Sequence, residues 1–275
     1  MDALLSAGLY IVATPIGNLG DMTPRGAEIL RGVAAIACED TRVTGKLLHH
    51  LGIKARMIRY DDHAGDNARD GLLALAAKQA VALVSDAGTP LISDPGYKLV
   101  REARARGIPV TSLPGASAAI VALTLSGLPC DRFLFAGFLP SKDKARRDAL
   151  AALQAVPTTL IFYETSPRLT DALAAIGEVL PGREVAVARE LTKTFEECRT
   201  GSPTDLIAHY TAHPPKGEIV LIVAPSTNET TGEVDADALL RAALATQKPS
   251  QAAAEVARVT GMDRKALYVR ALELK

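Results

Sequence analysis

The chain has 275 residues, of which 48% are hydrophobic and 23% are charged. This composition is typical of a globular protein with one large or two medium domains, and it excludes a collagen, a disordered tail and a small disulfide-stapled protein. Lysine plus arginine and aspartate plus glutamate each number 31. The net charge of the whole chain therefore does not by itself point to a nucleic-acid partner or an acidic substrate, and any basic surface must be local.

The three cysteines, Cys38, Cys130 and Cys198, lie far apart and form no CxxC pair. We therefore expect free thiols in a reducing compartment, without a disulfide framework or a metal site. The N-terminal residues lack the basic segment and the small-residue cleavage site of a signal peptide. No apolar run approaches the roughly 18 residues that a membrane span needs, so we expect a cytoplasmic protein.

Short runs rich in β-branched residues alternate along the chain with segments whose apolar residues recur every three or four positions. Strands are predicted at 9–15, 34–40, 80–86, 108–114, 133–138, 158–164, 184–190 and 218–224. Amphipathic helices are predicted between them, at 23–32, 41–52, 66–79, 96–107, 115–127, 144–154, 166–180 and 202–210. This alternation predicts an α/β fold with mostly parallel sheets. A turn-like stretch at 127–133 divides the series into an N-terminal α/β domain over 1–128 and a C-terminal α/β domain over 129–226.

The last fifty residues differ in character. A polar stretch at 226–237 is typical of a linker, and a helical segment is expected over 237–275. Ser250 is a candidate N-cap and Gly261 a candidate C-terminal glycine of its middle helix, with a short turn before the last helix, as in a helix-turn-helix. A three-helix cap packed on the core or on a partner chain is the alternative. Seven basic and seven acidic residues from 226 onward give only weak grounds for binding duplex nucleic acid.

Three loops directly after predicted strands are rich in turn residues: TPIGNLGD at 14–21, SDAGTPLISDPG at 85–96 and LPGASAA at 113–119. In α/β proteins the carboxyl ends of parallel strands carry the ligands. By spacing alone the first loop is best explained as an ordinary strand-helix turn. The second favours a functional role, because two Asp, two Gly and two Pro crowd into twelve positions.

The order and spacing of these strings, together with EDTR at 39–42, FYETSPR at 162–168, ARE at 188–190 and GE at 217–218, resemble the tetrapyrrole-methylase-like superfamily. Within it they are most similar to the small-subunit ribosomal RNA cytidine-2′-O-methyltransferase I family. The resemblance covers 9–224. It implies two α/β domains that hold S-adenosylmethionine between them, a helical C-terminal extension and a homodimer.

Residue by residue, the resemblance implies that both domains contribute to the methyl-donor site. The implied donor-binding residues are Pro15, Gly17, Asp86, Gly88, Thr89, Ser117, Ala118, Tyr163, Glu164, Glu190, Gly217 and Glu218. No metal is expected, because the sulfonium of the donor already activates the methyl group.

Transfer to a ribose hydroxyl requires a group that removes the hydroxyl proton. Glu39, Asp40 and Arg42 in CEDTR lie at the end of a predicted strand and are the candidate catalytic residues. A helix-capping cluster, with Asp40 or Thr41 as the N-cap, explains the same residues at least as well.

An RNA substrate needs cations that neutralise phosphate. The string KDKARR at 142–147 provides four, Lys142, Lys144, Arg146 and Arg147. The alternative is an ordinary solvated helix face.

The sequence therefore predicts an S-adenosylmethionine-dependent ribose 2′-O-methyltransferase acting on a cytidine in the decoding region of 16S ribosomal RNA, free or in the assembled subunit. A tetrapyrrole C-methyltransferase and a ligand-sensing nucleic-acid-binding regulator are the alternatives. A nicotinamide dehydrogenase is disfavoured, because no GxGxxG with a following ribose-binding acid is present.

Overall fold

The computed structural model describes residues 5–61, 65–226, 236–260 and 262–274. The chain divides into two compact units, Met1–Pro225 and Ser226–Lys275. The predicted linker at 226–237 lies, apart from its ends, outside the described residues. Among the described helices, none is both long enough and apolar enough to cross a membrane.

The first half of the larger unit is built on a five-stranded sheet in which all neighbouring strands are parallel. Its order is β3-β2-β4-β1-β5, and its strands are β1 (Gly8–Val12), β2 (Ala35–Cys38), β3 (Met57–Arg59), β4 (Ala80–Leu83) and β5 (Val110–Leu113). From β1 the chain crosses toward β2, whereas from β4 it crosses in the opposite direction toward β5. The neighbours β1 and β4 therefore form the topological switch point, outside whose carboxyl ends α/β proteins bind ligands.

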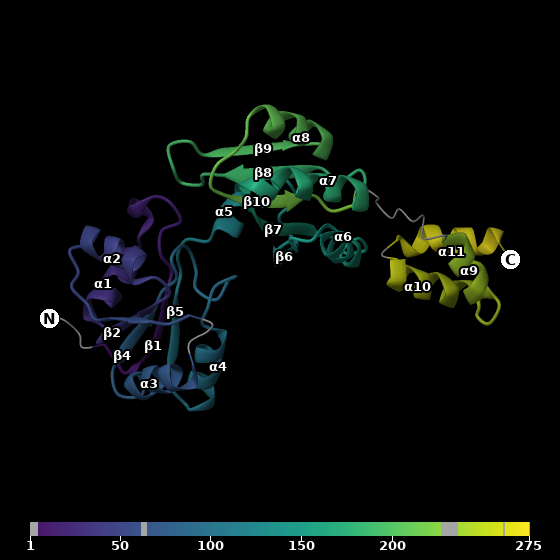
Figure 1. The fold of residues 1–275 in the computed structure, drawn as a ribbon. Helices are drawn as coiled ribbons and strands as arrows, with labels where there is room; N and C mark the ends of the chain where they lie inside the picture. The colour runs from purple at the N-terminus through teal and green to yellow at the C-terminus, as the bar shows by residue number, and fades with distance from the viewer. Residues whose placement is uncertain (1–4, 62–64, 227–235, 261, 275) are drawn as a thin grey trace. The chain divides into compact units, whose positions relative to one another are not determined.

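Helices cover both faces of this sheet, because its strands bury side chains on both sides (Figure 1). Ile36 and Cys38 of β2 face one pair of helices, and Ala37 faces the other pair. The helices are α1 (Pro24–Gly32) and α2 (Thr41–His50) on the first face, and α3 (Asp66–Ala76) and α4 (Tyr97–Ala105) on the second.

The second half of the larger unit contains another five-stranded sheet, with the order β6-β7-β10-β8-β9. Its strands are β6 (Phe133–Phe138), β7 (Thr159–Thr165), β8 (Val185–Arg189), β9 (Glu197–Gly201) and β10 (Glu218–Val223). Only β6 and β7 are parallel, whereas the other three neighbouring pairs are antiparallel. The expectation of mostly parallel sheets is correct for the first sheet and wrong for the second, where β8 and β9 form a hairpin and β10 runs against both of its neighbours.

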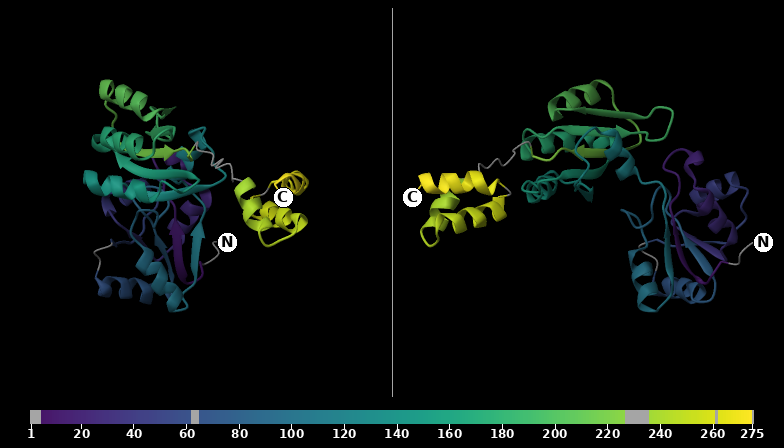
Figure 2. Two further views of the ribbon diagram at one scale, coloured as in Figure 1. Left: turned by 90° about the vertical axis from the view of Figure 1, so that its right-hand side faces the viewer. Right: turned by 180° about the vertical axis from the view of Figure 1, so that it is seen from behind.

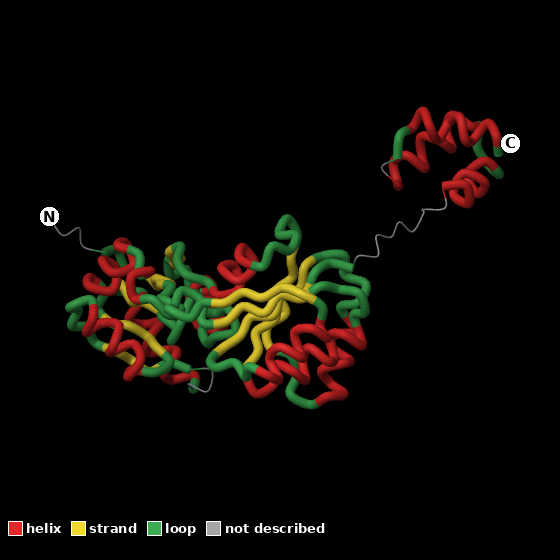
Figure 3. The backbone as a smooth tube through the Cα atoms, turned by 90° about the horizontal axis from the view of Figure 1, so that it is seen from above, coloured by secondary structure: helices red, strands yellow, loops and turns green. Residues whose placement is uncertain are grey.

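Four helices cover the second sheet. Figure 3 shows strands in yellow and helices in red. Leu160 and Phe162 of β7 face three of them, and Ile161 faces the fourth, α5. Helix α5 precedes residue 128, yet it packs on β7 and β10. The expected border between 128 and 129 stays a prediction. The helices are α6 (Asp143–Ala152), α7 (Leu169–Val179) and α8 (Pro203–Ala212) on one face and α5 (Ala118–Leu125) on the other.

The strands β3 and β9 are absent from the sequence prediction. Both lie at the edge of their sheet. Residues Met57–Arg59 are only three in number, and Glu197–Gly201 carries mostly polar or charged side chains. An edge strand pairs on one side only and is often short or charged, so it leaves little apolar alternation to detect.

The C-terminal unit consists, within its described residues, of three packed helices, coloured yellow-green to yellow in Figure 2. They are α9 (Ala236–Leu244), α10 (Pro249–Thr260) and α11 (Arg264–Glu273), and their own core includes Leu240, Val256 and Leu267. Helix α10 begins at Pro249, so the prediction of Ser250 as its N-cap is wrong. Proline fits the first helical position because it lacks the N–H that has no partner there. Gly261 lies outside the described residues.

Candidate functional site

The loops that follow β1 and β4 are joined at the switch point. The N–H of Thr14 donates to the carbonyl of Gly88, and the N–H of Gly88 donates to the carbonyl of Thr14, both at 2.9 Å. The Thr14 hydroxyl donates to the carbonyl of Ser85 at 3.1 Å. The Thr89 hydroxyl connects this pair to the loop after β5 by donating to the carbonyl of Ala116 at 2.9 Å. Three loops that are far apart in sequence thus form one surface.

A cavity with about 960 Å³ of space, part of it open to solvent, lies against this surface. Nine of the twelve predicted donor-binding residues line it: Asp86, Gly88, Thr89, Ser117, Ala118, Tyr163, Glu164, Glu190 and Glu218. The other lining residues were not predicted: Ile16, Ala87, Ile92, Ser93, Asp94, Phe138, Leu191, Lys193, Ile219 and Val220.

The remaining three predicted residues, Pro15, Gly17 and Gly217, lie beside the cavity. Pro15 lines a smaller neighbouring pocket that shares Asp86. A Cβ atom at Gly17 would lie 2.7 Å from Cγ of Lys193, and one at Gly217 would lie 2.5 Å from Oε1 of Glu190. Glycine at these positions lets two loops pack closely against the β8–β9 loop that forms one wall.

Strained backbone is concentrated in two of the loops around the cavity. Leu91 and Ser93 have φ angles of 74° and 62°, and Glu190 and Thr192 have φ angles of 50° and 64°. Non-glycine residues rarely adopt this left-handed region, and the strain persists only where surrounding contacts enforce it. These four are all of the non-glycine residues with positive φ in the described chain. Their location therefore points to the cavity as a functional site.

The cavity wall is acidic. The carboxylates of Asp86, Asp94, Glu190 and Glu218 belong to lining residues, whereas Lys193 is the only lining cation among the described residues. The ammonium of Lys193 is already paired with Glu190, with Nζ 3.0 Å from Oε1. Such a wall favours a positively charged ligand.

Asp94 is the lining residue whose protonation is most perturbed. Its pKa is raised to about 6, mainly by burial and in part by the nearby carboxylates of Glu39, Asp86 and Glu218, whereas a hydrogen bond with the Ser85 hydroxyl lowers it. Burial also raises the pKa of Asp86, while the Asp40 N–H that donates to its Oδ1 at 3.2 Å lowers it. The sequence did contain a signal for Asp94, since it follows Asp86 within the same turn-rich loop.

Aromatic rings form the wall on the side of the second sheet. The ring of Tyr163 meets Phe135 and Phe138 edge-on, with centroids 4.9 and 5.6 Å apart. Burial raises the pKa of the Tyr163 hydroxyl. Phe138 is 52% exposed, so its ring remains available to a ligand.

Glu164 differs from the other carboxylates because its side chain leaves β7 on the face of Phe162, away from Tyr163. It is fully buried, and burial raises its pKa. Its Oε1 accepts from the N–H of Thr165 at 2.8 Å and lies 3.1 Å from Nε of Arg168. We therefore expect Glu164 to support the β7 end of the cavity from behind.

The candidate catalytic residues Glu39, Asp40 and Arg42 do not line the cavity. Asp40 is the N-cap of α2, and its carboxylate accepts from the Arg42 N–H at 2.7 Å and forms an ion pair with Nη2 at 2.6 Å. The guanidinium of Arg42 holds the pKa of Asp40 well below its usual range. The capping alternative thus accounts for these contacts, and no observation here tests a catalytic role.

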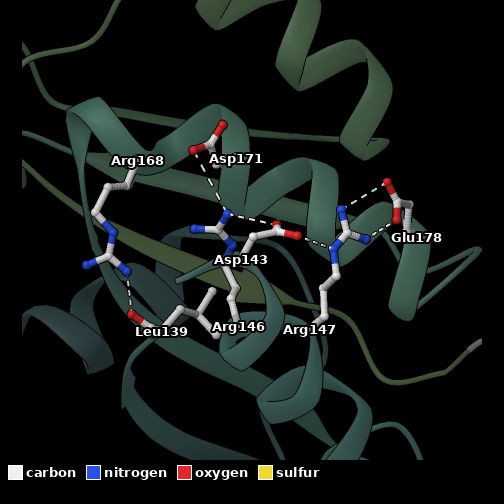
Figure 4. A network of polar contacts seen from close by, with 7 residues as sticks. All are labelled: Leu139, Asp143, Arg146, Arg147, Arg168, Asp171 and Glu178. Atoms are coloured by element: carbon white, nitrogen blue, oxygen red, sulfur yellow. Dashed lines mark hydrogen bonds and ion pairs between the residues drawn. The ribbon is translucent and has the colours of Figure 1, made fainter. Parts of the chain in front are cut away.

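The four cations of the predicted RNA-binding segment at 142–147 lie in two different environments. Lys142 and Lys144 are exposed. Arg146 is only 3% exposed and lies 3.2 Å from Asp143, whereas Arg147 is paired with Asp143 and Glu178 (Figure 4). Lys142 and Lys144 therefore remain available to phosphate. The guanidiniums of Arg146 and Arg147 are occupied by carboxylates of α6 and α7.

Comparisons with known proteins agree with this architecture. The tetrapyrrole (corrin/porphyrin) methylases match residues 8–207. The structure resembles diphthine synthase, with a TM-score of 0.62 and 14% identity over 78% of this chain and 89% of that one. It also resembles the uroporphyrin-III C-methyltransferase of Thermus thermophilus solved with S-adenosylhomocysteine, with a TM-score of 0.55 and 17% identity over 79% of this chain and 97% of that one. Fold and cavity together define a methyltransferase of the tetrapyrrole methylase class.

Closer relatives narrow the class to one family. Ribosomal RNA small subunit methyltransferase I of Erythrobacter litoralis is 65% identical over 98% of this chain and 96% of its own length. The protein of the same name from Mesorhizobium japonicum is 52% identical over 98% of this chain and 93% of its own length. Residues 230–275 match the RsmI C-terminal HTH domain. The chain belongs to the ribosomal RNA small subunit methyltransferase I family.

Proposed function

We propose that this protein transfers a methyl group from S-adenosylmethionine to the ribose 2′-oxygen of a cytidine in the decoding region of 16S ribosomal RNA. The observation that carries the proposal is the 65% identity to a ribosomal RNA methyltransferase over 98% of the chain, which includes both compact units. A tetrapyrrole substrate would give no reason for the C-terminal unit, and a ligand-sensing regulator would give none for the 65% identity to a protein named as a methyltransferase.

The negative charge of the cavity wall suits the proposed donor, which carries a positive charge. S-adenosylmethionine carries a sulfonium whose methyl carbon is already activated for transfer, so the proposal requires no metal. Asp86 and Asp94 lie on the side of the first sheet and Glu218 on the side of the second, which surrounds a cation with carboxylates. Ser117 and Ala118 begin α5, where backbone N–H groups can bind the polar end of a ligand. Tyr163 and Phe138 offer rings for an aromatic base.

The residues of the chain must also orient the ribose and accept its proton. Asp94 is a better acceptor than Asp40, because a pKa of about 6 allows it to be ionised at neutral pH yet still basic, whereas Arg42 keeps Asp40 weakly basic. We propose Asp40 and Arg42 as positioning residues that act through the Asp40 N–H on Asp86. Glu39 contributes negative charge near Asp94.

The remaining parts of the proposal concern partners. Lys142 and Lys144 would contact RNA phosphates, and the C-terminal unit would bind the ribosomal particle. A homodimer is supported by α5, whose apolar residues Ile120 and Leu125 are each 44% exposed. A ribosomal substrate would place the protein in the cytoplasm.

The test is methyl transfer from radiolabelled S-adenosylmethionine to small ribosomal subunits purified from cells that lack the protein. The expected result is label on one cytidine, at a phosphodiester that resists alkali because its 2′-oxygen is blocked. An Asp86→Ala variant is the matched control for the donor site. Label on a base, label on a tetrapyrrole precursor, or no label on either RNA or particle would refute the proposal.

A further inference from the structure

Another pocket adjoins the donor cavity and has no part in the proposed methyl transfer. It lies between the β8–β9 loop and the segment that joins α8 to β10, and it holds about 740 Å³ of open space. Its walls include Glu190, Phe195, His213, Pro214, Pro215 and Lys216, which together define the β8–β9 pocket. Glu190 lines both this pocket and the donor cavity, so the two are neighbours within the larger unit.

The walls of the β8–β9 pocket offer flat surfaces. Phe195 is 75% exposed, the largest exposed fraction among the large hydrophobic residues that the structure leaves open. Across the pocket, the ring of His213 stacks on His209 with centroids 4.9 Å apart and an angle of 25° between the planes. Aromatic faces bind unpaired nucleobases without regard to sequence.

The charges around the pocket leave a cation free. Glu197 is held by Arg189 at 2.5 Å and by Arg199 at 3.2 Å. Glu190 is held by Lys193. By contrast, the described residues provide no carboxylate within ion-pair distance of Lys216, which is exposed. The carboxylates are therefore neutralised locally, and Lys216 can attract a phosphate.

The loop that carries Phe195 is fixed rather than loose. The N–H of Thr192 donates to the Glu196 carboxylate at 2.7 Å, and the N–H groups of Lys193 and Glu196 donate to the carbonyls of Glu190 and Lys193 at 3.0 and 3.1 Å. The positive φ angles at Glu190 and Thr192 belong to the same turn. An exposed aromatic ring on a fixed loop loses little conformational entropy on binding.

We propose that the β8–β9 pocket binds an unpaired nucleotide of the substrate RNA close to the methylated residue, with its base on Phe195 and its phosphate on Lys216. This inference rests on the proposed function, since it assigns a subsite to the same RNA strand. It accounts for an exposed ring on a hydrogen-bonded loop, and for a lysine with no ion-pair partner among the described residues, both next to the donor cavity. Sequence-specific RNA recognition usually targets unpaired nucleotides whose bases stack on aromatic side chains, which suits a stacking site beside the donor cavity.

The test compares Phe195→Ala and Lys216→Ala with two controls, Phe133→Ala and Lys78→Ala. Phe133 and Lys78 are exposed, and they lie at or just before the amino ends of β6 and β4, away from the carboxyl ends that carry the site. For each variant, the KM for small ribosomal subunits, binding of a fluorescein-labelled single-stranded RNA oligonucleotide, and binding of S-adenosylhomocysteine are measured.

Loss of base stacking in Phe195→Ala should raise the RNA KM and the oligonucleotide Kd about tenfold. Lys216→Ala should reduce the slope of log affinity against log salt by about 0.7, the value for one phosphate on a single strand. Both variants should bind S-adenosylhomocysteine as the wild type does. The conservative variant Phe195→Tyr, which keeps an aromatic ring, should bind RNA as the wild type does. The controls should match the wild type.

Three outcomes would overturn the inference: an unchanged RNA KM and Kd in Phe195→Ala, an equal loss in Phe133→Ala, or a changed sedimentation coefficient in Phe195→Ala, which would mark the pocket as a contact between copies of the chain. Failure of the proposed function would look different. In that case the wild type itself would methylate no ribosomal subunit, and oligonucleotide binding would still report on the pocket independently.

Discussion

Replacing Asp94 with asparagine should stabilise the protein at alkaline pH while impairing its activity. Asp94 belongs to the acid-lined cavity, and burial raises its pKa from 3.8 to about 6. The folded protein therefore binds the Asp94 proton more tightly than the unfolded chain does. Stability falls as pH rises from about 4 through about 6, and the full cost of the buried charge is present above that range. Asparagine carries no charge at any pH and avoids this cost.

The magnitude follows from the difference of about two between the ordinary and the raised pKa. At 1.36 kcal/mol for each pKa unit, the cost at pH 8 is at most about 3 kcal/mol. Solvent at the open side of the cavity screens the charge, so we expect a gain of about 1 to 2 kcal/mol in the free energy of unfolding for Asp94→Asn.

Urea unfolding of the wild type and Asp94→Asn at pH 4, 6 and 8 measures this gain. The free energy of unfolding of the variant should exceed that of the wild type at pH 8. The difference should be smaller at pH 6 and should vanish at pH 4. Asp131→Asn, at an exposed position outside the cavity lining, is the matched control and should show no such trend. Equal stabilities at pH 8, or a gap that widens as pH falls, would refute the argument. Methyl transfer by Asp94→Asn should fall despite the higher stability, as expected at sites that sacrifice stability for function.

Other changes test the remaining parts of the site. Asp86→Ala should leave the chain folded but weaken S-adenosylhomocysteine binding at least about tenfold in isothermal titration, since a charge-assisted contact is worth about 1.5–3 kcal/mol; unchanged affinity would remove this loop from the site. Changing both Lys142 and Lys144 to alanine should reduce the salt slope of RNA binding by about 1.4 and leave donor binding intact, whereas an unaltered slope would make them ordinary surface lysines. Arg146→Ala should instead lower the urea midpoint, because its side chain is 4% exposed and packs with Asp143; a loss of RNA affinity without a loss of stability would contradict its buried role. A chain ending at Ser226 should fold and bind the donor yet methylate ribosomal particles poorly, since the C-terminal unit has its own core; full activity, or loss of donor binding, would show otherwise.

The sequence was sufficient to predict the strands beside the cavity, because β1 and β4 are buried apolar runs and β1, β4 and β5 each precede a turn-rich loop. It could not reveal the direction of β10, since strand polarity depends on the path of the connections rather than on local pattern. The edge strand β9 was missed for lack of apolar alternation. Its hairpin loop contributes Lys193 to the cavity and Phe195 to the β8–β9 pocket, which is why neither residue was predicted.

The spacing of residues within the cationic segment at 142–147 already indicates that Arg146 is buried. Arg146 lies four residues before Leu150 and seven before Leu153, so it falls on the apolar stripe of α6. That spacing distinguishes it from Lys142 and Lys144. The two partners of Arg147 are less accessible to sequence reasoning, because Glu178 is thirty-one residues away and meets it only when α6 and α7 pack together.

The position of α5 affects how this fold could be divided or recombined. The helix leaves the first sheet directly after the Ser117 loop, yet its Ala119, Ala122 and Leu123 are buried against the second sheet. A fragment that ends at residue 128 would carry α5 without the surface that buries it, and a fragment that begins at residue 129 would expose one whole face of its sheet. Exchange of halves between related proteins would keep both cores intact only with a junction before α5. Such a cut falls beside Ser117 and Ala118, which line the cavity, so the two halves of this enzyme are expected to be inherited together.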